Sequence, residues 1–332
     1  MKTLVLGGTR FIGRHTVAAL QTAGHQITLL NRGQTGPALF PELPRIRADR
    51  ESGEGLAELR GDWDVIVDLS AYFPRTLEAL LAMLRGRVGR YVHCGTLSSY
   101  TAAAGEGPFP LLDESSPLRE CSAAEAVDPS MASYGQRKAE CERVVGRAGI
   151  PAVVLRPCVV FGAHDPTDRL AWWFDRAAGG ERFVLPEDGL TIVRRTYAPD
   201  LAQAFVKATS APAAIGHAYN IAETNPLSFR ETLLAAAPKN HDPLANAVSV
   251  SADRLLAAGV RAWSDFPLWI PRTNLLVDTY SARADLQFHS TDARLAIQTA
   301  AEAFRSERRP PSAGISRARE QELLAGWPTP AL

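Results

Sequence analysis

Residues 3–13 read Thr-Leu-Val-Leu-Gly-Gly-Thr-Arg-Phe-Ile-Gly, a short apolar strand that runs into a glycine-rich turn. Apolar residues then recur at helical spacing over 12–23 and stop at Gly24, which predicts a helix after the turn. The N-terminus of such a helix offers free N–H groups and partial positive charge to a phosphate. Gly7 permits the tight turn, and Gly13 lets helix and strand approach closely. The stretch therefore predicts a dinucleotide site rather than an ordinary strand–helix turn. The residues expected to form it are Gly7, Thr9, Arg10, Phe11, Ile12 and Gly13.

Strands and helices continue to alternate up to about residue 160. Short apolar runs predict strands at 4–6, 27–30, 46–48, 65–69, 91–94 and 152–155. Helical spacing with a plausible stop predicts helices at 12–23, 77–87 and 132–147, and more weakly at 55–60. Strands that alternate with helices form βαβ units and a parallel sheet. We therefore expect an α/β fold with a doubly wound parallel sheet, the Rossmann fold, over 1–162.

The pattern loosens after about residue 163. We expect a smaller, mixed and mostly helical substrate-binding lobe over 163–308, with some segments that return to the first domain. Helices are predicted there at 199–210, 228–237, 252–258 and 291–306. Arg308-Arg309-Pro310-Pro311-Ser312 predicts an exposed linker into a C-terminal tail, 309–332. The cluster of Trp172, Trp173 and Phe174 is either the core of this lobe or, less commonly for such clusters, a substrate platform.

The composition excludes several classes of protein. The chain has 332 residues with 36 basic and 36 acidic side chains, so no net charge directs it to nucleic acid or to an anionic membrane. Four cysteines without a CxxC pair form neither a disulfide framework nor a zinc site. His164, Asp165 and Asp168 are more typical of a solvated loop than of a metal site, and we expect no metal. Because no segment resembles a signal peptide or a membrane span, we expect a cytoplasmic protein.

The residues after the second strand indicate which dinucleotide binds. An acidic residue there accepts hydrogen bonds from the adenosine ribose and favours NAD. This chain has Asn31 instead, and Arg32 could pair with the 2′-phosphate of NADP, with help from Arg10. NADP is therefore the expected cofactor and NAD is possible, although Arg32 could also be a solvated arginine. Asp49 either contacts the adenine edge or caps the short helix after the third strand.

Three residues form a candidate catalytic set. Tyr134 and Lys138 are four residues apart in a predicted helix and share one face. A lysine ammonium favours the phenolate of a nearby tyrosine, so the pair can exchange a proton with a hydroxyl or carbonyl group while a hydride moves. Thr96 lies two residues past the strand at 91–94, where open α/β sheets bind their ligands.

Together these motifs resemble the extended short-chain dehydrogenase/reductase family, also called the NAD-dependent epimerase/dehydratase family. The resemblance covers most of the chain. The matching segments are Gly-Gly-Thr-Arg-Phe-Ile-Gly at 7–13, Asp-Val-Ile-Val-Asp-Leu-Ser-Ala at 64–71, Cys-Gly-Thr-Leu-Ser-Ser-Tyr at 94–100, Tyr-Gly-Gln-Arg-Lys at 134–138, Leu-Arg-Pro-Cys-Val-Val-Phe-Gly at 155–162, Arg-Thr-Tyr-Ala-Pro-Asp-Leu-Ala at 195–202 and Tyr-Asn-Ile-Ala at 219–222.

The resemblance implies a role for each matched residue. Tyr134 would be the acid/base, and Lys138 would bind the nicotinamide ribose and tune Tyr134. Thr96 would hold the substrate oxygen. Ser70 and Ala71 would lie against the cofactor, and Pro157 would flank the nicotinamide. Arg194 and Arg195 lie near the family's phosphate-binding arginine, and either that role or a surface role is open. The helices at 77–87 and 132–147 would form a four-helix homodimer interface.

The chain departs from the family pattern at three places. Arg10 replaces the usual second glycine, Asn31 replaces the usual acidic residue, and Cys158-Val159-Val160 lacks an asparagine that many UDP-sugar epimerases use. Arg10 and the run at 29–33 also resemble an atypical branch that includes chloroplast stem-loop-binding proteins.

We expect an NAD(P)-dependent oxidoreductase or epimerase that moves a hydride at a secondary alcohol or ketone, with a sugar or nucleotide sugar as the expected small-molecule substrate. The alternative is a non-catalytic NADP- or RNA-binding protein on the same scaffold, which the complete catalytic set and the zero net charge disfavour.

Overall fold

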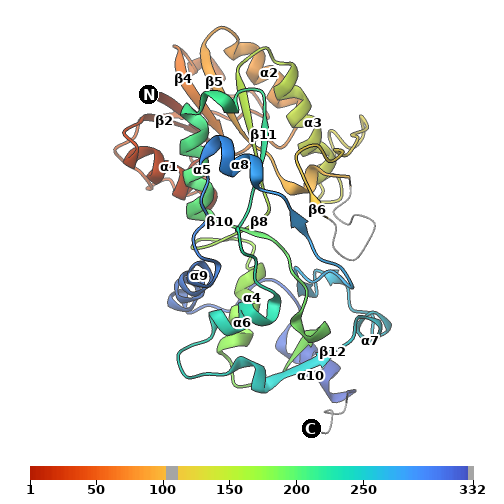
Figure 1. The fold of residues 1–332 in the computed structure, drawn as a ribbon. Coiled ribbons are helices and arrows are strands. Elements are labelled where there is room, and N and C mark those ends of the chain that lie inside the picture. Colours follow the sequence, from red (N-terminus) through yellow and green to blue (C-terminus); the bar gives the residue numbers. More distant parts are fainter. Residues whose placement is uncertain (102–110, 328–332) are drawn as a thin grey trace.

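Seven parallel strands form one sheet at the centre of the larger lobe (Figure 1). The computed structural model describes residues 1–101 and 111–327. The strand order is β11-β7-β5-β4-β1-β2-β3. The strands are β1 (Lys2–Leu6), β2 (Gln26–Asn31), β3 (Arg45–Arg47), β4 (Trp63–Asp68), β5 (Val88–Cys94), β7 (Ala152–Pro157) and β11 (Ala218–Ile221).

The order of the strands reverses beside β1. The chain moves from β1 to β2 and β3 on one side, and then crosses to β4 and β5 on the other. The carboxyl ends of β1 and β4 therefore border a crevice, which is where open α/β sheets bind ligands. A Cβ built on Gly7, just after β1, would lie 3.5 Å from the Cβ of Leu69, just after β4. The predicted doubly wound fold is confirmed.

Helices cover both faces of the sheet, as the uninterrupted apolar strands require. Helix α1 (Ile12–Thr22) packs against α5 (Ala198–Ser210) on one face. Helix α2 (Pro74–Leu84) packs against α3 (Tyr134–Arg147) on the other. Two separate apolar clusters lie beneath these pairs. The short α8 (Tyr280–Leu286) also lies with this lobe, against β11 and α5.

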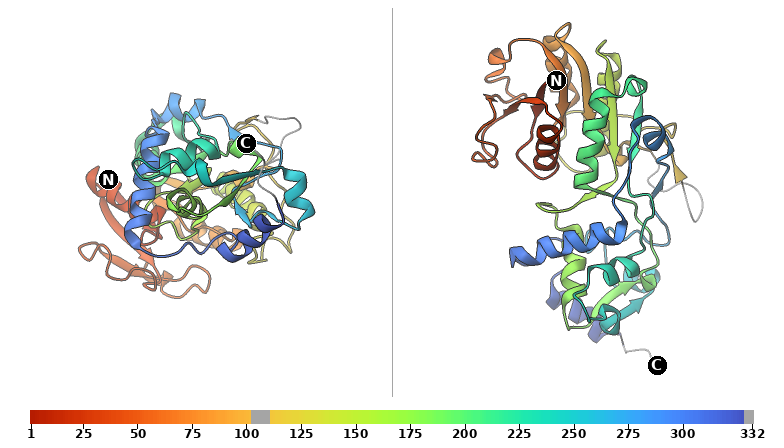
Figure 2. Two further views of the ribbon diagram at one scale, coloured as in Figure 1. Left: turned by 90° about the horizontal axis from the view of Figure 1, so that it is seen from below. Right: turned by 60° about the vertical axis from the view of Figure 1, so that its left-hand side comes forward.

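The second lobe is mixed and mostly helical (Figure 2). Its remaining elements are α4 (Arg169–Ala178), α6 (Phe229–Ala236), α7 (Ala252–Ala257), α9 (Ala293–Glu307) and α10 (Arg317–Ala325), with the short strand pairs β8 (Val159–Phe161) with β10 (Arg195–Tyr197), β9 (Phe183–Pro186) with β12 (Ala247–Val250), β13 (Ala262–Trp263) with β14 (Phe266–Pro267), and β6 (Leu111–Leu112) with β15 (Leu276–Val277). Trp172 and Trp173 are fully buried in its core, with their rings edge to face at 4.7 Å. These tryptophans are therefore core residues rather than a substrate platform.

The segment from 308 to 327 is tied to this lobe, although Arg308–Pro310 and Ser312 are exposed, as the composition predicts. The guanidinium of Arg309 donates two hydrogen bonds to the buried carboxylate of Asp168, at 2.6 and 2.8 Å, and Ser312 donates two more. Further on, Glu320 of α10 is fully buried and pairs with Arg176 at 3.0 Å. Partners more than 100 residues away in the chain hold this segment. Within the described ranges, no helix combines the length and the apolar character of a membrane span.

Candidate active site

The glycine turn after β1 has the shape that a pyrophosphate needs. Gly7 has a φ of +99°, which favours glycine, and a Cβ on Gly13 would lie 2.7 Å from the backbone of Gly8. No described side chain caps α1, and its first turn contains no acidic residue. The N–H groups of Gly13 and Arg14 donate to the carbonyls of Arg10 and Phe11, at 2.8 and 2.9 Å. The partial positive charge at the start of α1 still favours an anion there, so the turn fits a dinucleotide phosphate.

The end of β2 is tied to this turn by Asn31. The Asn31 side chain accepts a hydrogen bond from the N–H of Gly33 at 2.9 Å and donates one to the carbonyl of Gly7 at 3.3 Å. Arg32 is 56% exposed and lies 3.9 Å from the carboxylate of Asp49, a contact too long and too exposed to hold it firmly. Its guanidinium remains available to a ligand.

Asp49 caps the turn after β3, where its carboxylate accepts a hydrogen bond from the N–H of Glu51 at 2.9 Å. The following short helix begins at Gly55 without a cap from any described side chain. Arg47 is opposite Asn31 in the pairing of β2 with β3 and its side chain lies over Gly33. Sequence reasoning missed this second arginine because nothing in the spacing relates 47 to 31.

A buried ion pair supports the segment of Ser70 and Ala71. Asp68, at the end of β4, is fully buried and accepts two hydrogen bonds from Arg50, at 2.8 and 2.9 Å. It also accepts one from the hydroxyl of Tyr91 and one, at 2.9 Å, from the N–H of Ser70. Burial alone would raise the pKa of Asp68, but Arg50 and these hydrogen bonds outweigh it and lower the pKa. The carboxylate therefore orients the turn that follows β4.

Thr96 and Tyr134 are brought together at the carboxyl end of β5. Thr96 is 9% exposed and begins a single helical turn, where its hydroxyl accepts a hydrogen bond from the N–H of Ser98 at 3.2 Å. Tyr134 is the first residue of α3. Burial raises the pKa of Tyr134 to about 12, against the opposing effects of a hydrogen bond with Thr96 and of the guanidinium of Arg169. The phenol is therefore protonated at neutral pH.

Lys138 lies one helical turn further along α3, buried among acceptors. Its ammonium donates to the carbonyl of Ala71 at 2.8 Å and to the carbonyl of Cys94 at 2.6 Å. Nε2 of the buried His93 lies 3.5 Å away. Burial and the Lys138 charge lower the pKa of His93 well below its usual range, so the imidazole is neutral. Nδ1 of His93 has no partner among the described residues.

Two further side chains have an electrostatic effect at Tyr134 or share one with it, and neither was anticipated. Tyr72, after β4, is 46% exposed, and its ring centroid lies 6.4 Å from that of Tyr134. Burial of its hydroxyl and the nearby Tyr134 raise the pKa of Tyr72, whereas Lys138 and Arg10 lower it. Arg169, the first residue of α4, is the second. Neither residue belongs to a sequence motif, and no spacing rule relates either of them to Tyr134.

The other candidates have structural partners. Arg195 is buried against Glu223, and Arg194 donates to the carbonyls of Thr224 and Val277, so neither guanidinium is free for a phosphate. Pro157 ends β7 and is buried beside β11. Burial raises the pKa of Cys94 to about 11, which keeps the thiol protonated. Across residues 1–101 and 111–327, no cluster of three or more His, Cys, Asp or Glu side chains could hold a metal ion.

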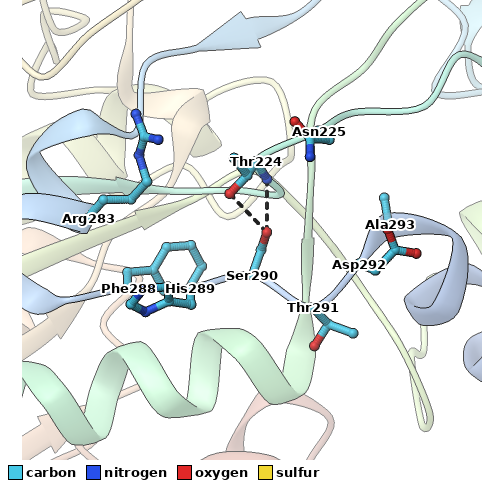
Figure 3. Close-up of a pocket in the computed structure, with 9 residues that line it drawn as sticks. All are labelled: Thr224, Asn225, Arg283, Phe288, His289, Ser290, Thr291, Asp292 and Ala293. Carbon is cyan, nitrogen blue, oxygen red and sulfur yellow. Dashed lines mark hydrogen bonds between the residues drawn. The ribbon is translucent and has the colours of Figure 1, made fainter.

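A cavity of about 400 Å³ lies elsewhere, near the start of α9 (Figure 3). Ser290 bridges to Thr224 there with two hydrogen bonds of 3.0 Å. Its lining residues are Thr224, Asn225, Arg283, Phe288, His289, Ser290, Thr291, Asp292 and Ala293. None of the candidate catalytic or cofactor residues is among them.

Comparison with known proteins agrees with this geometry. The model of the NAD dependent epimerase/dehydratase family matches residues 3–73 and 69–222. A chloroplast stem-loop binding protein of 41 kDa from Arabidopsis thaliana is 27% identical over 69% of this chain and 60% of its own length. The 2'-dehydrokanamycin reductase of Streptomyces kanamyceticus is 29% identical over 70% of this chain and 64% of its own length. The 2-alkyl-3-oxoalkanoate reductase of Stenotrophomonas maltophilia is 30% identical over 71% of this chain and 76% of its own length. The chain thus spans less than two thirds of the first two of these relatives.

Solved structures share the fold at lower identity. The UDP-glucuronic acid 4-epimerase from Bacillus cereus, in complex with NAD, superposes with a TM-score of 0.65 at 17% identity, over 93% of this chain and all of the other. A short-chain dehydrogenase/reductase superfamily protein from Agrobacterium tumefaciens with bound NAD has a TM-score of 0.68 at 19% identity, over 97% of this chain and all of the other. The chain therefore belongs to the NAD dependent epimerase/dehydratase family.

Proposed function

We propose that this protein is an NADP(H)-dependent ketone reductase in which Tyr134 is the general acid, Thr96 holds the substrate oxygen and Lys138 supports Tyr134. The observation that carries this proposal is that the helical turn capped by Thr96 packs against α3, which begins at the half-buried Tyr134 and carries Lys138 one turn further along. Two relatives named above are reductases, and the name of one of them, the 2-alkyl-3-oxoalkanoate reductase, contains an oxo group. A nucleotide-sugar epimerase is the second candidate, since the UDP-glucuronic acid 4-epimerase shares the fold.

The residues that would hold the dinucleotide lie along the crevice. The glycine turn and α1 would bind the pyrophosphate, Asn31 and Arg32 the adenosine ribose, and Ser70, Ala71 and Pro157 the nicotinamide half. When bound there, the dinucleotide would supply the hydride that reduces the carbonyl carbon of the substrate. Thr96 donates a hydrogen bond to the carbonyl oxygen, and Tyr134 transfers its proton to that oxygen, which yields the alcohol. Lys138, fixed by the carbonyls of Ala71 and Cys94, stabilises the phenolate that remains.

The protonation state of Tyr134 favours reduction over oxidation. A phenol with its pKa raised to about 12 by burial holds its proton at neutral pH and is ready to donate it. Oxidation of an alcohol needs the phenolate first. We therefore expect the reduction rate to stay level through neutral pH and to fall at alkaline pH as Tyr134 ionises, in a profile measured with saturating NADPH.

The test is NADPH consumption, followed by absorbance, with a panel of 3-oxo acids, their esters, keto-sugars and UDP-sugars. The proposal predicts ketone-dependent oxidation of NADPH with an alcohol product identified by NMR. Interconversion of UDP-sugars without net cofactor consumption would favour the epimerase instead. NADP binding with no turnover of any member, or binding of RNA, would favour the non-catalytic alternative.

Cofactor choice is expected to depend on Arg32. A charge-assisted hydrogen bond to the 2′-phosphate contributes about 1.5–3 kcal/mol, and about 1.4 kcal/mol corresponds to a factor of ten. NADPH should therefore bind at least about tenfold more tightly than NADH. Arg32→Ala should remove most of that preference by weakening NADPH alone, and Asn31→Asp should reverse it by repulsion. Calorimetric dissociation constants for both cofactors measure the effect.

Arg182→Ala is the matched control, because this exposed arginine lies in the other lobe. A wild-type preference for NADH, or a preference that Arg32→Ala leaves unchanged, would show that Arg32 is a solvated surface arginine. If only Arg47→Ala changes the ratio of the NADPH and NADH dissociation constants, then Arg47, on β3, is the partner of the 2′-phosphate.

We further propose a homodimer through α2 and α3. The two helices lie side by side, and Glu78 of α2 is 3.5 Å from Arg147 of α3. The outer face of α2 includes Ala79, Ala82 and the exposed Met83, which a second copy could cover. Light scattering at micromolar concentration should give about twice the chain mass of 35.9 kDa. A monomer mass would contradict the proposal.

A further inference from the structure

We propose that His93 is a positioning residue for Lys138: the lone pair of its Nε2 is the third acceptor for the Lys138 ammonium and holds that charge in place for the proton transfer by Tyr134. This inference rests on the proposed reductase function and adds a residue to its machinery. It starts from the acceptors around the ammonium, since Lys138 is only 2% exposed and water cannot replace them.

The Lys138 ammonium has three N–H donors, and each needs an acceptor when the group is buried. Two acceptors are backbone carbonyls, that of Ala71 at 2.8 Å and that of Cys94 at 2.6 Å. The third contact within residues 1–101 and 111–327 is Nε2 of His93 at 3.5 Å. It is longer than the other two and is the one that a side chain supplies. A substitution can therefore remove it without a change of the backbone.

This contact determines the tautomer of His93. An ammonium donates hydrogen bonds and cannot accept them, so Nε2 can face it favourably only with a lone pair, which places the proton of the neutral ring on Nδ1. Nδ1 is buried and has no partner among residues 1–101 and 111–327. A buried N–H group without an acceptor costs free energy that an apolar ring at this position would not. Such a cost is expected where a polar group has a function, here the lone pair of Nε2.

The imidazole of His93 is held in place by the sheet beneath it. His93 is opposite Asp68 in the pairing of β5 with β4, and its ring is stacked with that of Tyr91, with centroids 6.4 Å apart and planes at 16°. The hydroxyl of Tyr91 donates to the carboxylate of Asp68, and that carboxylate also orients the turn that presents the carbonyl of Ala71. The buried ion pair thus supports two of the acceptors that surround Lys138.

The first experiment measures kcat and KM for ketone reduction in His93→Phe and His93→Gln. Phenylalanine keeps a ring against Tyr91 but offers no acceptor. Because the contact is long, kcat should fall by about tenfold, the lower end for one charge-assisted hydrogen bond. The KM for the ketone should stay within about twofold, since the interaction acts on the proton transfer and not on substrate binding. The side-chain oxygen of glutamine can take the place of Nε2 and should restore most of kcat.

His217→Phe is the matched control. The His217 ring also pairs with a tyrosine two residues away, with its centroid 6.4 Å from that of Tyr219. His217 precedes β11 and so lies at the amino end of the sheet, opposite the edge where Lys138 lies. This control should keep the wild-type kcat. His93→Phe should unfold at no lower temperature than the wild type, because the substitution removes a buried polar atom without a partner.

The second experiment does not depend on turnover. ¹⁵N NMR of the histidine rings, with the His93 signals identified by their absence in His93→Phe, should show a proton on Nδ1 and none on Nε2 at neutral pH. A proton on Nε2 would overturn the inference, as would an unchanged kcat in His93→Phe. Equal losses of kcat in His93→Phe and His93→Gln with lower unfolding temperatures would show a structural role instead. Failure of the wild type to reduce any ketone would overturn the reductase proposal, whichever tautomer the spectra show.

Discussion

Tyr134→Phe should lower the rate of ketone reduction by about 10²- to 10⁴-fold, the usual loss when a general acid is removed. The substitution keeps the ring at the start of α3 but removes the hydroxyl that we propose as the general acid. The NADPH dissociation constant should stay close to that of wild type, because Lys138 and the glycine turn are untouched. Steady-state kinetics and fluorescence titration of NADPH measure the two quantities.

Tyr72→Phe is the matched control for this prediction. The second phenol has its ring centroid 6.4 Å from that of Tyr134, but it has no hydrogen-bond partner among the described residues. Its removal should cost less than about tenfold in rate, well below the loss of a general acid. Full activity in Tyr134→Phe together with a large loss of activity in Tyr72→Phe would show that Tyr72, and not Tyr134, is the general acid.

Asp68→Asn should lower the free energy of unfolding by about 3–5 kcal/mol, the cost of leaving one partner of a buried ion pair uncompensated. Asp68 is fully buried, and the side chain of its partner Arg50 is 8% exposed. Chemical denaturation with a circular-dichroism signal measures the change. Asp64→Asn is the control, because Asp64 lies on the same strand but is exposed, and it should cost no more than about 0.5 kcal/mol.

The same pair gives a pH dependence with a defined sign. The pKa of Asp68 is lowered in the folded protein, so the ion pair contributes stability above the unfolded pKa of a carboxyl group. That contribution is lost as the pH falls below about 4 and approaches the folded value. Wild type should therefore lose stability in acid more steeply than Asp68→Asn. Parallel acid denaturation curves would mean that Asp68 carries no net stabilisation.

The sequence predicted the sheet and its helices well because their signals are local. Apolar runs, helical periodicity and glycine stops marked β1, α1 and α3 within a few residues of their observed bounds. The resemblance to the family could be recognised because its motifs lie on these same elements. The sequence alone could place Tyr134 and Lys138 together, because residues four apart lie on the same face of a helix.

The missed features all depend on contacts between distant segments. Helix α4 was not predicted because its tryptophans form a nearly continuous apolar run. Asp168, which precedes the helix, has a positive φ and turns its carboxylate to Arg309 instead of capping the helix. The contact between Arg309 and Asp168 joins residues 141 apart, so no local pattern could predict it. Arg50 similarly reaches Asp68 from a loop, and no spacing rule connects them.

The most direct test of hydride transfer uses NADPH deuterated at the reactive carbon of its nicotinamide ring. The protein is incubated with this cofactor and the ketone panel, and the alcohol product is analysed by mass spectrometry and NMR, with Tyr134→Phe in parallel. The account predicts one deuterium on the carbinol carbon of the product in wild type and almost none in Tyr134→Phe. Tight binding of the cofactor with no transfer of deuterium to any carbonyl compound would contradict it.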